Sequence, residues 1–150
     1  MKKVLKSMKG MTLIEIMVVI TILGLIATVV TVNVLDRLDE AKVSTAKTQI
    51  KGLEEALDQF RRDNGSYPTT EQGLQALIEK PTTGRIPSRY PPKGYLKGGK
   101  VPKDPWSGEY KFYSPGIQGH EYEIYSLGRD GQEGGEGIDA DISSFETEEK

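Results

Sequence analysis

The feature that most constrains this chain is the apolar run from Met11 to Leu35, which contains a single charged residue, Glu15. A helix rises about 1.5 Å per residue, so a run of this length reaches about 37 Å, and the hydrocarbon core of a bilayer is about 30 Å thick. The run therefore predicts a transmembrane helix over residues 11–35. An ordinary secretory signal peptide is disfavoured, because its apolar stretch spans only about 7–15 residues and lacks a glutamate.

The segment before this run is strongly basic. Residues 1–9 contain Lys2, Lys3, Lys6 and Lys9 and no acidic residue. Positive charge next to a membrane span remains on the cytoplasmic side, so the N-terminus is expected in the cytoplasm and the remainder of the chain across the membrane.

Glu15 is the residue of the span that is energetically unfavourable in a membrane. An ionised carboxylate in a membrane helix costs about 2–4 kcal/mol unless it is neutralised, and the run contains no basic residue. A cut between Gly10 and Met11 would create an α-amino group one helical turn from Glu15, on the same chain or beside the glutamate of a neighbouring copy. The alternative is an uncut signal anchor in which the glutamate is incidental.

These residues resemble the class III signal of type IV prepilins, in which a short basic leader ends in glycine and precedes a T-L-I-E apolar helix. The match runs through Lys9, Gly10 and the residues from Thr12 to Glu15. The resemblance implies that a prepilin peptidase cuts after Gly10 and methylates the amine of Met11, and that Glu15 serves docking in a filament. This chain departs from the family in having Met11 where phenylalanine is usual and Val32 where many members have proline.

Beyond the span, residues 36–150 suffice for one small domain with a modest core. The apolar residues of its first part recur at steps of four and three, which is the pattern of one helix face: Ala46, Ile50, Leu53, Leu57 and Phe60. Asn64 and Gly65 are predicted to end this helix. One continuous helix is therefore predicted from Met11 to about Asn64.

The next segment is irregular and basic. Thr69 and Gln72 form a candidate capping box for a short helix that ends by Glu79. Residues 80–103 are rich in proline and glycine and carry seven basic residues and no acid, which fits either an ordered or a disordered long loop. Clustered cations can contact phosphates, but no nucleic-acid motif accompanies them, so no nucleic-acid partner is predicted.

Two strands are expected after the turn at Asp104. Residues 109–114 and 121–127 alternate with period two and are joined by a loop that contains His120, which is interpreted as an exposed residue. Trp106 is expected to pack over the core. The fold prediction is α+β: a long N-terminal helix, with a transmembrane and an amphipathic half, packed on a small antiparallel sheet.

From Leu127 the chain becomes an acidic, glycine-rich loop, with the sequence LGRDGQEGGEGIDADI. Calcium takes six to eight oxygen ligands from carboxylates and backbone carbonyls, and such a loop can supply both. The spacing is not that of an EF-hand. A merely solvated acidic loop remains the alternative from the residues alone.

Three blocks extend the resemblance over most of the domain: DNGSYPTTEQGLQAL, PKDPWSGEY and YSLGRDGQEGGEGIDADI. They are similar to the major pseudopilins of type II secretion systems, which have a type IV pilin-like fold. That family binds calcium through the last loop. The resemblance implies calcium ligands at Asp130, Asp139 and Asp141, with the Leu127 carbonyl as a backbone contributor, and an ordered loop that permits assembly.

The resemblance implies a structural subunit rather than an enzyme: a leader over residues 1–10, a transmembrane helix over 11–35 and a periplasmic head over 36–150. The subunit would be a single-pass protein of the inner membrane and would polymerise into a periplasmic pseudopilus that drives export of folded proteins across the outer membrane. Its implied partners are further copies of itself, prepilin peptidase, the inner-membrane assembly platform with its ATPase, and minor pseudopilins.

Three other functions compete with this interpretation. A type IV pilus or competence pilin would share the signal, but usually carries a C-terminal cysteine pair, and this chain has no cysteine. A membrane-anchored hydrolase would need a catalytic motif, and neither GxSxG nor HExxH occurs. A calcium-binding module on a passive anchor would need no cleavage.

Overall fold

A computed structural model describes residues 10–117 and 119–145, with side chains left undescribed at residues 29–36. The elements follow the order α1 (Leu13–Asn64), η1 (Leu74–Leu77), β1 (Lys111–Tyr113), β2 (Glu123–Ser126), η2 (Gly137–Asp139) and β3 (Ile142–Ser143). The chain divides into two compact units at the boundary between Leu38 and Asp39.

Helix α1 is continuous, as predicted, although it starts two residues after the predicted Met11. It begins at Leu13 and ends at Asn64, where Gly65 takes a left-handed conformation with φ 78° and its amide donates to the Arg61 carbonyl at 2.7 Å. A residue with a Cβ atom disfavours that conformation, so glycine is suited to this position. The predicted helix and its predicted stop are confirmed.

The core of the second unit forms along the predicted face of α1. Ile50, Leu53 and Leu57 are at most 1% exposed, and Phe60 is 2% exposed. Residues from outside the helix complete the cluster: Leu74, Leu77, Tyr110, Phe112, Ile124 and Ile142. Trp106 packs against this cluster, as predicted. The spacing of apolar residues in α1 therefore identified the buried face.

The segment after α1 begins with a reciprocal capping arrangement. The Thr69 amide donates to Gln72 Oε1 at 3.0 Å, and the Gln72 amide donates to Thr69 Oγ1 at 3.3 Å. The predicted capping box is confirmed, although the helix that follows is only the 3-10 turn η1. The amides of Ile78 and Glu79 still donate to the Gln75 carbonyl, and the Leu77 carbonyl accepts the amides of Tyr95 and Leu96.

The basic loop, residues 80–103, is ordered by aromatic contacts. The rings of Phe60 on α1 and Tyr95 lie 5.3 Å apart, and those of Tyr90 and Tyr95 lie 5.4 Å apart. Asn64 donates its side-chain amide to the Tyr95 hydroxyl at 3.1 Å. Of the two alternatives left by its composition, the loop is therefore the ordered one.

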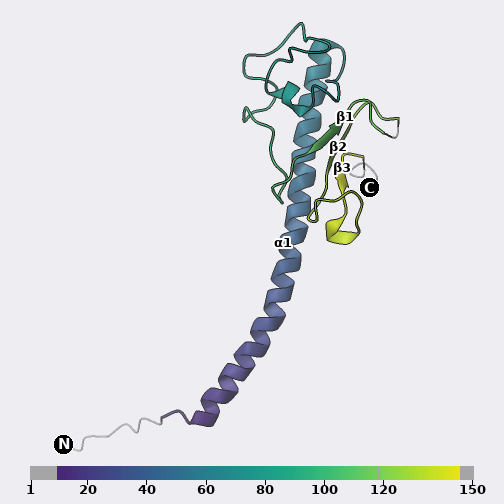
Figure 1. Ribbon diagram of the computed structural model, residues 1–150. Coiled ribbons are helices and arrows are strands. Elements are labelled where there is room, and N and C mark those ends of the chain that lie inside the picture. The colour runs from purple at the N-terminus through teal and green to yellow at the C-terminus, as the bar shows by residue number, and fades with distance from the viewer. Residues whose placement is uncertain (1–9, 118, 146–150) are drawn as a thin grey trace, which may run out of the picture. The chain divides into compact units, whose positions relative to one another are not determined.

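The sheet is antiparallel, in the order β1-β2-β3. Phe112 pairs with Ile124, and Tyr125 pairs with Ser143. Figure 1 shows the three strands beside the part of α1 that follows Asp39. A long helix with a small antiparallel sheet confirms the predicted α+β fold.

Three local predictions need correction. The strands are shorter than predicted, because residue 109 forms only an isolated bridge with Lys103 and the hairpin loop extends to residue 122. The short elements η2 and β3 lie where the glycine-rich composition predicted none. His120 is half-buried, since its ring stacks on that of Phe145 with centroids 3.6 Å apart.

Candidate functional site

The acidic loop, residues 127–141, connects β2 to β3. Its backbone turns through several glycines with positive φ, and two of them also lie where no side chain fits. A Cβ atom on Gly128 would stand 2.8 Å from the Ala140 carbonyl oxygen, and one on Gly135 would collide with the Asp139 carbonyl oxygen. The Asp141 amide donates to the Gly134 carbonyl at 3.2 Å. The loop therefore folds back on itself and brings its two ends together.

Asp141 presents a carboxylate oxygen without a partner. Its Oδ2 accepts the Gly134 amide at 2.9 Å, whereas its Oδ1 is buried and has no hydrogen-bond partner in the part of the chain that the structure describes. A buried acceptor without a donor is unfavourable. A cation that binds oxygen ligands would give this oxygen a partner, so the free carboxylate oxygen of Asp141 fits calcium.

The other predicted ligands have different neighbours. Both carboxylate oxygens of Asp139 accept hydrogen bonds from Arg129, and Asp130 Oδ1 accepts the Gln132 amide at 3.1 Å. Leu127 lies half-buried at the start of the loop. Within the described ranges, no three acidic, histidine or cysteine side chains gather as a group able to hold a metal. The ligand set therefore stays a prediction.

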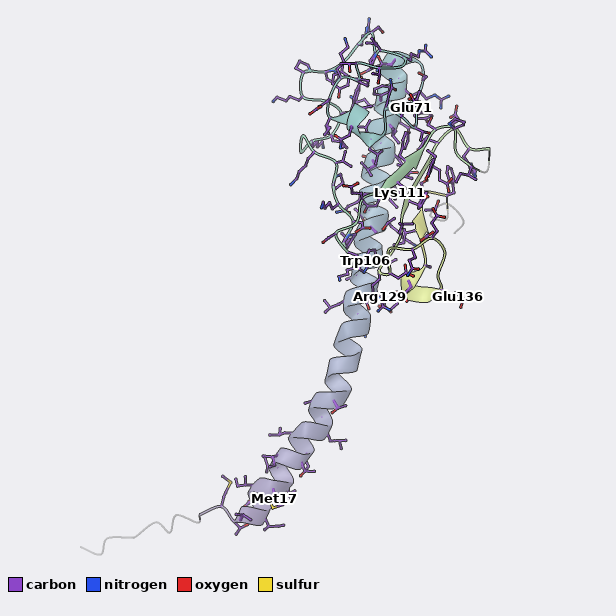
Figure 2. The ribbon with its side chains drawn as sticks, in the orientation of Figure 1. Met17, Glu71, Trp106, Lys111, Arg129 and Glu136 are labelled. Atoms are coloured by element: carbon purple, nitrogen blue, oxygen red, sulfur yellow. The ribbon has the colours of Figure 1, made fainter. Side chains whose placement is uncertain are left out.

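Arg129 is the residue of this loop that sequence reasoning missed. Its Nε donates to Asp139 Oδ1 at 2.8 Å and its Nη2 to Asp139 Oδ2 at 3.1 Å, while its Nη1 lies 3.5 Å from Asp39 Oδ2 on α1. Figure 2 shows Arg129 at the side of α1. The hydrogen bonds to Asp139 raise the pKa of Arg129. A signal was available, because Arg129 is the only basic residue between Leu127 and Glu149.

A buried polar network fixes the start of the acidic loop. Asp104 is 6% exposed, and its Oδ1 accepts the amides of Trp106 and Gly108 at 3.0 and 2.6 Å. Its Oδ2 accepts the hydroxyl of the fully buried Ser126 at 2.5 Å, and Ser126 Oγ in turn accepts the Gly128 amide at 3.2 Å. These bonds hold the backbone on both sides of Leu127, the predicted backbone ligand.

The N-terminal motif contains a second capping box. Gly10 and Met11 lie just before α1. At the start of the helix, the Thr12 amide lies 3.4 Å from Glu15 Oε2, and the Glu15 amide donates to Thr12 Oγ1 at 3.3 Å. The spacing T-x-x-E is the sequence signal of a capping box. Glu15 therefore caps the start of α1, and its docking role stays a prediction.

The apolar stretch of α1 that follows this motif is solvent-exposed throughout its described side chains, from Leu13 to Thr28. No helix among the described residues combines the length and the apolar character needed to cross a membrane. The predicted span over residues 11–35 also includes side chains from 29 to 35, which lie outside the described residues.

Known protein families match both parts of the chain. Residues 5–31 match the model of the prokaryotic N-terminal methylation motif, which together with a long helix and a small antiparallel sheet defines the class of pilin-like proteins. Residues 33–145 match the model of type II secretion system protein G. The chain belongs to this protein G family.

Individual relatives cover almost the whole chain. The type II secretion system core protein G of Pseudomonas aeruginosa is 48% identical over 141 residues, which are 94% of this chain and 97% of that protein. The core protein G of Vibrio cholerae is 46% identical over 143 residues, 95% of either chain.

A solved structure agrees with these sequence matches. The crystal structure of the major pseudopilin from the type 2 secretion system of enterohaemorrhagic Escherichia coli has a TM-score of 0.65 and 38% identity, covering 76% of this chain and 95% of that one. The prediction of a type II secretion major pseudopilin is confirmed, and the family is a structural one.

Proposed function

We propose that the chain is made as a precursor, cut after Gly10 and methylated on Met11, and that it acts as a non-enzymatic filament subunit. The match of residues 5–31 to the N-terminal methylation motif supports this processing. The main support for a filament subunit is the exposed apolar surface from Leu13 to Thr28, which begins three residues after the proposed cut. Such a surface needs a partner outside the chain, which is lipid before assembly and neighbouring copies after it.

The proposed topology follows from the charge of the two ends. Residues 11–35 anchor the subunit in the inner membrane as a single span, with the lysine-rich leader in the cytoplasm and the head over residues 36–150 in the periplasm. The apolar helices leave the lipid and pack together in the core of a periplasmic pseudopilus. The growing filament then pushes folded proteins toward the outer membrane.

The proposed partners are those that this route requires. Prepilin peptidase cuts and methylates the precursor, while an ATPase and an inner-membrane platform supply the work of assembly. Minor pseudopilins accompany the homo-oligomer. The alternative of a type IV pilus or competence pilin is not favoured, because the family match over residues 33–145 is to protein G.

Glu15 has two proposed roles in succession. In the precursor its carboxylate remains close to the Thr12 amide and stabilises the first turn of α1. After cleavage, the α-amino group of Met11 becomes available, either in the same chain or in a neighbour. Pairing of the two charges removes an uncompensated carboxylate from the apolar filament core.

We propose calcium as the ligand of the acidic loop, held by Asp130, Asp139 and Asp141 with the Leu127 carbonyl. The unpartnered, buried Oδ1 of Asp141 and the oxygen-rich composition support this assignment. Bound calcium would neutralise the carboxylates and order the loop. The network of Asp104 and Ser126 positions the backbone beside Leu127 for this role.

The intact mass of the membrane-extracted protein, expressed with and without a prepilin peptidase, tests the processing. The expected result is loss of residues 1–10 plus addition of one methyl group, only when the peptidase is present. The Glu15→Gln variant should be cut normally but fail to form filaments, because it cannot pair with the amine. An unchanged mass in both conditions contradicts the filament function and leaves a passive anchor.

A further inference from the structure

We propose that Arg129 is a built-in counter-ion of the acidic loop that competes with calcium for Asp139 and transfers to Asp39 when the ion binds. The inference rests on the proposed calcium function and adds to it a residue that sets the affinity. Its basis is the geometry of one guanidinium group shared between a predicted ligand and α1.

The guanidinium group occupies both oxygens of Asp139. Nε and Nη2 donate to Oδ1 and Oδ2 at 2.8 and 3.1 Å, which is the bidentate arrangement that arginine favours with carboxylates. Calcium binds carboxylate oxygens at about 2.3–2.6 Å. The calcium ion and the guanidinium group would therefore compete for the same carboxylate oxygens, and their positive charges would repel each other. The Arg129–Asp139 ion pair must open before Asp139 can become a ligand.

Asp39 provides the destination for the displaced cation. Its Oδ2 already lies 3.5 Å from Arg129 Nη1, and its side chain is 19% exposed, against 35% for Asp139. Arg129 can thus give up one carboxylate and keep the other without leaving its place beside α1. The two states keep the loop attached to the helix, either through Asp139 and Asp39 together or through Asp39 alone.

This exchange has two opposite consequences. Without calcium, Arg129 compensates part of the negative charge that would drive the loop open. With calcium, the same residue lowers the affinity, because each binding event displaces a favourable ion pair. The side chain of Arg129 is 45% exposed, so solvent screening keeps both effects modest.

The test is calcium titration calorimetry and thermal unfolding of the full chain in detergent after chelator treatment, comparing wild type with Arg129→Gln. The variant should bind calcium about fivefold more tightly, because competition and charge repulsion are removed. In chelator its unfolding temperature should fall by about 2–4 °C. Arg129→Lys keeps the charge but loses the bidentate contact. Its calcium affinity and its unfolding temperature should therefore lie between those of wild type and Arg129→Gln.

Arg61→Gln is the matched control. Arg61 pairs with Glu121 at 2.6 Å, is 46% exposed and has no contact with the acidic loop among the described interactions. This variant should lose thermal stability, while its calcium affinity should stay the same as that of wild type. An equal gain of affinity in both arginine variants would overturn the proposal, because the effect would then reflect net charge alone.

Asp39→Asn tests the exchange itself. Removing the second carboxylate leaves Arg129 on Asp139 and should weaken calcium binding by about twofold, and this effect should be lost in the Arg129→Gln background. The same factor in both backgrounds contradicts the transfer to Asp39.

The outcomes also separate the inference from the proposed function. Calcium binding by wild type with unchanged or weaker binding by Arg129→Gln overturns the inference and leaves the calcium assignment intact. Binding by Arg129→Gln alone overturns the transfer to Asp39, because calcium would then fail to displace Arg129 from Asp139 in wild type. Absence of binding in both proteins overturns the calcium assignment and the inference with it.

Discussion

The two ends of α1 differ in where their apolar residues find partners. From Leu13 to Thr28 every described side chain is exposed, whereas further along Ala46, Ile50 and Leu57 are at most 1% exposed. Both stretches are apolar and helical. The second is covered because loops and strands of the same chain pack on it, and the first has no such cover among the described residues of its own unit.

Apolar residues favour burial in both stretches, but only the second stretch has other parts of the same chain packed on it. A face with charged residues between its apolar positions fits a head that covers only one side. A helix that is apolar all round requires an environment that covers every side, which lipid or a bundle of identical helices supplies.

Truncation of an apolar side chain should change the free energy of unfolding very differently in the two stretches, and this is the largest effect expected. Leu57→Ala is expected to destabilise the head by about 3–5 kcal/mol, because Leu57 is fully buried. Leu23→Ala, at a residue that is 59% exposed, should change head stability by less than about 0.5 kcal/mol. Urea denaturation of the full chain in detergent, followed by Trp106 fluorescence, measures both. Equal losses of stability in the two variants would contradict this difference, because they would mean that the two stretches unfold as one.

The next effect concerns polar rather than apolar burial. Asp104→Ala should cost about 2–4 kcal/mol, because two amides and the Ser126 hydroxyl lose their acceptor in a buried site. Asp104→Asn is the matched control and should lose less, since it keeps an oxygen for the amides. The same urea titration reports both variants, and equal stability of Asp104→Ala and wild type would show that the network adds nothing.

Close packing of the acidic loop should give a smaller effect. Gly128→Ala is expected to cost about 2 kcal/mol, because φ is 64° and the added Cβ atom would lie 2.8 Å from the Ala140 carbonyl oxygen. Gly131 has φ 67° but open space around it, so Gly131→Ala should cost only about 1 kcal/mol. Thermal unfolding of the pair separates the clash from the conformational cost. A larger loss at Gly131 contradicts this explanation.

The smallest effect is expected at Tyr90, which packs against the core and donates to the Ala76 carbonyl at 3.1 Å. Tyr90→Phe should lower the free energy of unfolding by about 1 kcal/mol at neutral pH, because this hydrogen bond is lost. Burial raises the pKa of Tyr90 from 10.0 to about 12. The unfolded tyrosine therefore ionises first, and its share of stability is present below pH 10 and is lost as the pH rises toward 12.

The measurement is the urea midpoint of wild type and Tyr90→Phe at pH 8, 10.5 and 11.5. Wild type should lose more stability over this range, because the variant has one ionisable buried tyrosine fewer. Tyr110 and Tyr125, whose pKa values are also raised by burial, are retained in both proteins and contribute equally. Parallel pH profiles would rule out a contribution from Tyr90.

Much of the fold was accessible from local patterns. The spacing from Ala46 to Phe60 identified the buried face of α1, and Thr69 with Gln72 identified a capping box, because both signals involve residues close in sequence. The second capping box, Thr12 with Glu15, follows the same short-range rule, so the T-x-x-E spacing alone was enough to predict it.

Strand β3 illustrates what local patterns cannot supply. Ile142 and Ser143 follow a glycine-rich acidic loop and form a strand only because β2 offers pairing at Tyr125 and Ser126. The half-buried position of His120 likewise depends on Phe145 reaching its ring from another part of the chain. Both features come from contacts between distant residues.

Residue type and spacing alone predict the long helix, its apolar and amphipathic stretches, the N-terminal motif and the oxygen-rich composition of the acidic loop. These properties depend on residue type and short-range spacing. Folding of the whole chain is needed to bring Arg129 to Asp139 and Asp39, and to bring Asp104 to Ser126 at the start of the loop. Each of these contacts joins residues that the chain must fold to bring together, and their energies depend on a burial that no local pattern records.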